Sequence, residues 1–147
     1  MRAKYIPFLV FQFCFFLSFG QKKVPKSKKL IVNSIDSHTE NLIKISDSIW
    51  SLAETALLEV ESSEILASYA ERQGFKVERG VAGMPTAFVA TYGSGSPVIS
   101  VLGEFDALPG ISQKAQPTKG ALKEGAAGHG CGHNLFGAGS LGAAIAI

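Results

Sequence analysis

In Phe75-Lys76-Val77-Glu78-Arg79, apolar and charged residues alternate with the period of two that is typical of a β-strand. Before this stretch, apolar residues recur at three- and four-residue steps, which is the pattern of an amphipathic helix. The change of period divides the chain into a helical first part and a later part that contains strands. Helices followed by such strands predict an α/β or α+β layer structure.

Two helices are expected before this point. The first carries an apolar stripe with Trp50 close beside it, and its members are Ile35, Leu42, Ile45, Ile49, Leu52 and Ala56. The second is expected from about Ser62 to Gln73. Ser62 or Ser63 could cap its start, and Gly74 suits the left-handed position that ends a helix.

Two further strands are expected after it, over residues 86–92 and 97–102, joined by a short turn at Gly93-Ser94-Gly95-Ser96. Residues 98–102 are almost continuously apolar, which is typical of a strand that is buried on both faces. We therefore predict an α/β fold in which helices flank a mixed sheet.

The last part of the chain is expected to hold a loop and a helix. Residues 111–128 are polar and contain glycines, and a loop of this length predicts a functional role or mobility. Residues 135–147 carry no charge and predict a helix that starts close to His133 and is buried on all sides. This apolar helix stops without a cap or a polar tail, so we expect the natural protein to continue past Ile147 and this chain to be an N-terminal fragment.

The first residues have the layout of a secretory signal peptide. Arg2 and Lys4 precede an apolar run over residues 6–19, and small residues stand before a cleavage point between Gly20 and Gln21. We predict a signal peptide over residues 1–20, a basic linker over 21–33 and one domain over 34–147. The protein is then exported to the periplasm or the extracellular space, and it contacts a membrane only if the signal segment stays uncleaved.

The composition fits one globular domain, since 46% of the 147 residues are hydrophobic and 18% are charged. The net charge of +2 comes largely from a lysine cluster, Lys22, Lys23, Lys26, Lys28 and Lys29. We interpret this cluster as a solvated linker, and no nucleic-acid partner is indicated. Cleavage would leave Cys131 as the single cysteine, which excludes an internal disulfide framework.

Soft and borderline metal ligands are concentrated in Gly128-His129-Gly130-Cys131-Gly132-His133-Asn134. A thiolate and an imidazole two positions apart, with glycines between them, can turn toward one transition-metal ion or two adjacent ones. We predict that Cys131 and His133 are metal ligands; otherwise Cys131 is a small core residue and His133 a helix cap. His129 is either a third ligand or a group that supports the ligands or faces substrate.

Two carboxylates, Glu104 and Asp106, follow the predicted apolar strand 98–102, at a position where α/β sheets place functional loops. Strand alternation would direct both to the same side. Asp106 could accept the second ring proton of a histidine ligand, either carboxylate could contact a metal, or both could be solvated. The sequence assigns neither as a general base.

Three blocks together resemble the M20 family of metallopeptidases and amidohydrolases, in the branch of the aminobenzoyl-glutamate utilization protein B. They are Gly83-Met84-Pro85-Thr86-Ala87-Phe88-Val89-Ala90, Gly103-Glu104-Phe105-Asp106-Ala107-Leu108-Pro109-Gly110 and the cysteine-histidine block 128–134. The resemblance extends from about Ile35 to the last residue. It implies the N-terminal part of a zinc-peptidase-like catalytic domain, which a smaller lid or dimerisation domain normally interrupts.

The resemblance also implies amide hydrolysis by water that two divalent ions activate, with Zn²⁺ or Mn²⁺ expected and Co²⁺ or Ni²⁺ also suitable. Cys131 and His133 correspond to ligands, and Asp106 to an aspartate beside the metals. Glu104 and Asn134 depart from residues that other members carry, so they and His129 are assigned only a supporting position near the ligands.

In the family, the general-base glutamate and the remaining ligands come later than Ile147, so this chain alone is expected to be inactive. The implied substrate of the complete protein is an N-acyl or aryl-amide conjugate of an amino acid, or a short peptide, and a homodimer is implied. One alternative is a non-catalytic module that binds a metal or ligand. Another is an interaction module that uses Trp50 and the apolar last helix.

Overall fold

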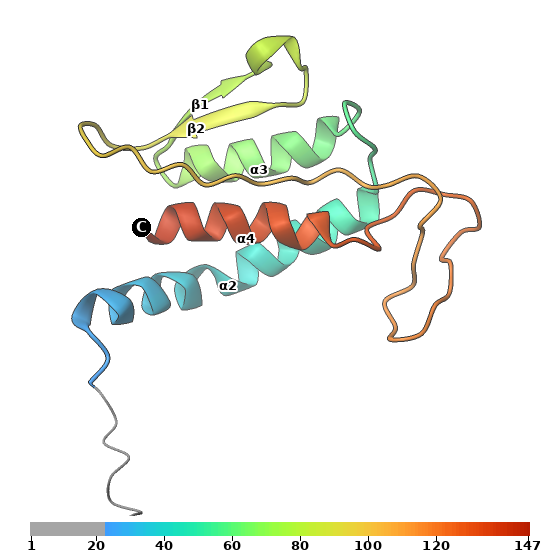
Figure 1. The fold of residues 1–147 in the computed structure, drawn as a ribbon, viewed down its shortest axis with the longest axis horizontal. Coiled ribbons are helices and arrows are strands. Elements are labelled where there is room, and N and C mark those ends of the chain that lie inside the picture. The colour runs from blue at the N-terminus through green and yellow to red at the C-terminus, as the bar shows by residue number, and fades with distance from the viewer. Residues whose placement is uncertain (1–22) are drawn as a thin grey trace, which may run out of the picture.

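The computed structural model describes residues 23–147 as three helices and a small sheet (Figure 1). Helix α2 spans Lys26–Leu52, α3 spans Val60–Arg72 and α4 spans His133–Ala146. Strands β1 (Lys76–Arg79) and β2 (Phe88–Thr91) pair antiparallel, and the 3-10 turn η1 (Val81–Gly83) lies between them. The predicted α/β class is confirmed.

The predicted signal peptide, residues 1–20, lies outside the described residues. In residues 23–147, none of the helices combines the length and the apolar character that crossing a bilayer requires.

The core lies where the three helices meet, with α4 drawn between α2 and α3 in Figure 1. Its buried members come from all three helices: Ile45, Ile49, Leu66, Tyr69, Ala70, Ala138 and Leu141. The hairpin packs against α3 and adds partly buried side chains, among them Val77 and Phe88. Burial of this apolar surface is the main force that holds α4, and with it His133, in place.

The described part of the predicted basic linker, residues 21–33, is helical from Lys26 onward. Pro25 stands immediately before α2 with φ −53, and proline is well tolerated at a helix start because its missing N–H is not needed there. Once a helix is nucleated, each added residue gains a hydrogen bond. The helix that forms in the packed part of α2 therefore continues toward the N-terminus through the exposed lysines. Residues 26–33 are all exposed, as expected for a solvated segment.

The predicted third strand is not formed within the described chain. Residues 97–102 are extended but pair with no described strand, and Val98 and Leu102 are 84% and 75% exposed. After β2 the chain does not fold back along that strand; it runs across the face of the helices toward the loop 111–127 (Figure 1). An apolar run has a buried-strand pattern whether or not neighbouring strands are present, which is why the prediction failed.

Helix α4 starts at His133 as predicted, but it is buried on one face and not on all sides. Gly137, Ala138 and Leu141 are buried, whereas Leu135 and Phe136 on the other face are 66% and 43% exposed. The small residues of the buried face let α2 approach closely, since a Cβ at position 142 would lie 2.8 Å from Leu42 Cδ1. Among the described residues, nothing covers the second face.

The start of α3 is capped by Glu54, not by the predicted Ser62 or Ser63. The helix begins earlier, at Val60, and the Glu54 carboxylate accepts the N–H groups of Glu61 (3.1 Å) and Ser62 (2.8 Å). Ser62 Oγ also donates to it, at 2.7 Å. Gly74 follows the helix with φ +89, so its predicted role is confirmed.

We expect Glu54→Gln to lower the free energy of unfolding by about 1 kcal/mol at neutral pH, as loss of a helix cap does. Partial burial raises the pKa of Glu54, but the hydrogen bonds from Ser62 and from the backbone outweigh it, so this pKa lies below its usual 4.5. As the pH falls, Glu54 is therefore protonated in the unfolded chain before it is protonated in the folded chain. The stabilisation by the Glu54 carboxylate is fully present above about pH 4.5 and is lost as the pH falls through the pKa of Glu54 in the folded state.

Urea unfolding from neutral pH down to about pH 3 measures this effect. The difference between the unchanged protein and Glu54→Gln should shrink on acidification. Glu40→Gln, at an exposed position of α2, is the matched control and should show no such trend. An equal pH dependence of both variants would contradict the capping role.

Candidate metal centre

Three ligand-type side chains converge at the start of α4. Glu104 and Asp106 come from the extended segment before the loop, and His133 is the first residue of the helix. One ligand atom from each lies within 4.8 Å of the others. His133 Nδ1 lies 2.8 Å from Asp106 Oδ1, and His133 Nε2 lies 3.2 Å from Glu104 Oε2. The imidazole is therefore held between two carboxylates.

The packing of Phe105 explains why the two carboxylates reach the same histidine. Its ring turns toward the core and lies 6.1 Å from the Phe88 ring, so its two neighbours turn to the opposite side. The segment is pressed against α4, because a Cβ at position 137 would lie 3.0 Å from the Glu104 carbonyl oxygen. Ala107 N–H also donates to the Glu54 carbonyl at 2.6 Å. The predicted alternation of Glu104 and Asp106 matches this geometry.

The spacing of the donors fits a divalent cation. If Nδ1–H of a neutral His133 donates to Asp106, the bare Nε2 faces the acceptor oxygen of Glu104, and only a proton or a cation can relieve that contact. Two ligand atoms of a tetrahedral zinc site, each about 2.0–2.1 Å from the ion, lie about 3.3 Å apart. The observed 3.2 Å between Nε2 and Oε2 is close to that separation, and it equally matches a direct N–H···O hydrogen bond between the two side chains.

The centre is open to solvent on one side. The Glu104 side chain is 52% exposed, while those of Asp106 and His133 are 20% and 24% exposed. An ion or a small molecule can therefore approach from the Glu104 side. Glu104 contacts His133 just as Asp106 does, although the sequence analysis assigned Glu104 only a supporting position. The sequence feature that could have shown this is its spacing of two residues from Asp106, which places both carboxylates on one side of an extended segment.

The structure does not bring Cys131 into this cluster. The cysteine is exposed, on a turn that the Gly132 N–H closes by donating to the His129 carbonyl at 3.0 Å. Gly132 has φ +89, a left-handed conformation that places His133 at the first position of α4. The prediction that Cys131 is a ligand remains a prediction.

His129 is buried and turned toward α2. It is 6% exposed, and Nε2 lies 3.1 Å from the Ile49 carbonyl, which can only accept, so Nε2 carries the proton. Its Nδ1 is buried without a hydrogen-bond partner among the described residues. Burial lowers the pKa of His129, more than the bond to Ile49 and the charge of Asp106 raise it, which favours the neutral ring.

Asn134 is buried next to His133 and also turns to α2. Its Nδ2 donates to Ser46 Oγ at 2.9 Å and to the Ser46 carbonyl at 3.3 Å. Sequence reasoning did not identify Ser46. A serine within a helix stripe carries no pattern that would connect it with residues almost ninety positions away.

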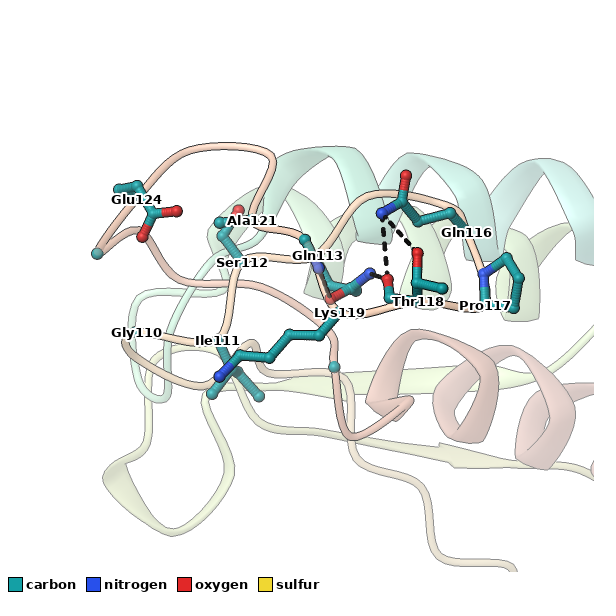
Figure 2. A pocket seen from close by; sticks show the side chains of 13 residues that line it. Gly110, Ile111, Ser112, Gln113, Gln116, Pro117, Thr118, Lys119, Ala121 and Glu124 are labelled. Atoms are coloured by element: carbon teal, nitrogen blue, oxygen red, sulfur yellow. Dashed lines mark hydrogen bonds between the residues drawn. The ribbon is translucent and has the colours of Figure 1, made fainter.

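The loop 111–127 lines an open hollow of about 750 Å³ (Figure 2). The two ends of this loop are joined by Leu108 and Gly128, which exchange two backbone hydrogen bonds of 3.1 Å each. Within the loop, the Gln113 side chain donates to the Lys114 and Thr118 carbonyls and accepts the Gly120 N–H. Gly130 also lines the hollow, so this loop lies next to the segment that carries Cys131 and His133.

Comparison with known proteins found one strong similarity. The chain is 46% identical over 122 residues to a subunit of p-aminobenzoyl-glutamate hydrolase from Escherichia coli (strain K12). The match covers 81% of this chain and 25% of the relative, so the chain spans about a quarter of the length of the curated protein that it matches. No family model matches the chain.

Proposed function

We propose that the chain is a member of the M20 family, in the branch that its motifs resemble, and that it acts in metal-dependent hydrolysis of amide bonds; its similarity to this p-aminobenzoyl-glutamate hydrolase supports the proposal. The name of the relative is that of a hydrolase, which supports a hydrolase function. The observation that carries the metal-dependent part is the placement of His133 between Glu104 and Asp106, with a donor spacing that fits an ion.

Each residue of the cluster has a distinct proposed role. His133 and Glu104 would hold a divalent ion, while Asp106 accepts the Nδ1 proton and so fixes the tautomer and orientation of the ring. Cys131 is proposed as a thiolate ligand of the same centre, because the glycines on both sides allow its turn to rearrange. We propose two ions per complete site, Zn²⁺ or Mn²⁺, with Co²⁺ or Ni²⁺ also compatible with these donors.

When bound, such ions activate a water molecule and polarise the carbonyl of the scissile amide. We propose that the general base is not among the described residues, since both carboxylates of the cluster are engaged with His133. The chain by itself is then inactive toward amides. The described part of the chain would hold the ion through Glu104 and His133, and Asp106 keeps the proton on Nδ1.

The proposed substrates are N-acyl or aryl-amide conjugates of amino acids, or short peptides. The name of the relative specifies p-aminobenzoyl-glutamate, an aryl amide of an amino acid, which supports this class. The hollow beside Gly130 is of the size that small-molecule sites have. We further propose export, directed by residues 1–20, and a homodimer of the complete protein.

The complete gene product, loaded with Zn²⁺ or Mn²⁺, should release p-aminobenzoate from p-aminobenzoyl-glutamate, and a chelator should abolish this release. His133→Ala should remove the activity. His38→Ala is the matched control, because His38 lies away from the cluster and is bonded to Tyr69. Hydrolysis that is indifferent to chelation would contradict the proposal, and zinc binding without turnover of any amide would favour the alternative of a non-catalytic metal-binding module.

A further inference from the structure

We propose that helix α2 sets the geometry of the metal centre, with Ser46 as a positioning residue that acts through Asn134. This inference rests on the proposed function, because it concerns how the same site is held. The metal loop, residues 129–134, is held on α2 by hydrogen bonds to Ser46 and to the carbonyl of Ile49.

The loop is fixed at both of its ends. At the first end, His129 Nε2–H donates to the Ile49 carbonyl at 3.1 Å. At the second, Asn134 Nδ2 donates to Ser46 Oγ at 2.9 Å and to the Ser46 carbonyl at 3.3 Å. The two acceptors lie on one face of α2, about one turn apart.

All four residues are shielded from water. Ser46 is 5% exposed, Ile49 is fully buried, and His129 and Asn134 are each 6% exposed. Water cannot replace a hydrogen bond that is lost in such a place, so these bonds restrain position more than exposed ones would. For the His129 side chain, whose Nδ1 has no partner among residues 23–147, the bond to the Ile49 carbonyl is the one described hydrogen bond.

The segment between the two anchors has little stiffness of its own. It consists of Gly130, Cys131 and Gly132, which lead into His133 at the start of α4, and glycines leave many backbone conformations open. Asn134 directly follows His133 at the start of α4. Its bond to Ser46 therefore adds to the packing of α4 in setting the position from which the His133 ring reaches Asp106 and Glu104. Loss of the anchor should therefore weaken metal binding more than it weakens the fold.

The test compares Ser46→Ala with Ser48→Ala in the complete gene product. Ser48 lies on the exposed side of the same helix and donates within it, to the Lys44 carbonyl at 2.8 Å. The affinity for Zn²⁺ is measured by competition with a chelating dye, and thermal unfolding without metal is measured in parallel. We expect Ser46→Ala to weaken zinc binding by about 10–100-fold, as the loss of an outer partner of a ligand does, and Ser48→Ala to leave it unchanged.

A double-mutant cycle identifies the pathway. Ser46→Ala combined with Asn134→Ala should bind zinc no more weakly than Asn134→Ala alone, because both remove the same contact. His129→Phe keeps a planar ring, somewhat larger than imidazole, and removes its N–H, while the Ile49 carbonyl still accepts the Ala53 N–H at 3.1 Å. This variant should also lose zinc affinity, and it provides the test if Ser46→Ala does not fold.

The failures are distinguishable. If the unchanged protein binds zinc and Ser46→Ala and His129→Phe bind it equally well, the positioning role is refuted and the proposed function stands. If the unchanged protein binds no divalent ion, the metal-dependent function is refuted, and this inference with it.

Discussion

Replacing His133 with alanine is expected to lower the zinc affinity of the protein by more than about 100-fold, beyond what the loss of an outer partner costs. Both ring nitrogens of His133 are engaged, Nδ1 with Asp106 at 2.8 Å and Nε2 with Glu104 at 3.2 Å. Removing the ring takes away a ligand and leaves two carboxylates facing each other without a partner between them.

Asp106→Asn should have a smaller effect, about 10–100-fold, because the amide keeps its size but no longer offers a charged acceptor to Nδ1–H. Competition titration with Zn²⁺ gives all these affinities, and His38→Ala is the control for the loss of a histidine elsewhere.

Titration of Cys131→Ser with Co²⁺ decides the role of the cysteine, since thiolate ligation gives a charge-transfer absorption that the variant would lose. Unchanged zinc affinity in His133→Ala would refute the centre described above.

The second large effect is expected from Gly137→Ala, which should lower the free energy of unfolding by about 1–3 kcal/mol, the usual range for overpacking. The new Cβ would lie 3.0 Å from the Glu104 carbonyl oxygen and 3.1 Å from Phe105 Cβ. Backbone cannot give way as a flexible side chain can, so α4 must move away from the segment that carries Glu104 and Asp106. Zinc affinity should fall together with stability.

Gly139→Ala is the matched control for this substitution. It lies on the same helix, and an added Cβ there meets no atom within 4 Å. Alanine is the better helix former, so this variant should gain up to about 1 kcal/mol. Urea unfolding of both variants measures the difference. Equal stabilities of Gly137→Ala and Gly139→Ala would contradict the close packing of α4 on residues 104–105.

Local patterns predicted the elements whose partners are near in sequence or whose period is regular. The three helices, the β1–β2 strands and the left-handed Gly74 are of this kind. The pairing of Glu104 with Asp106 on one side followed from strand alternation alone. In these cases the physical cause lies within the segment itself, so the sequence carries it.

The failures have the opposite cause, since each depended on what a segment meets in space. Residues 97–102 have the pattern of a buried strand but find no neighbouring strand among the described residues. The cap of α3 comes from Glu54, which lies before the helix, and the contact of Ser46 with Asn134 joins residues 88 positions apart. No local signal predicts such contacts.

The most direct test of the metal centre is a crystal structure of the protein with Zn²⁺, in which anomalous scattering locates the ion. We predict a zinc peak between His133 Nε2 and the Glu104 carboxylate, at about 2.0–2.2 Å from each, with Nδ1–H still bonded to Asp106. An anomalous peak elsewhere, with the imidazole of His133 still bridging two carboxylates as it does without metal, would contradict the account.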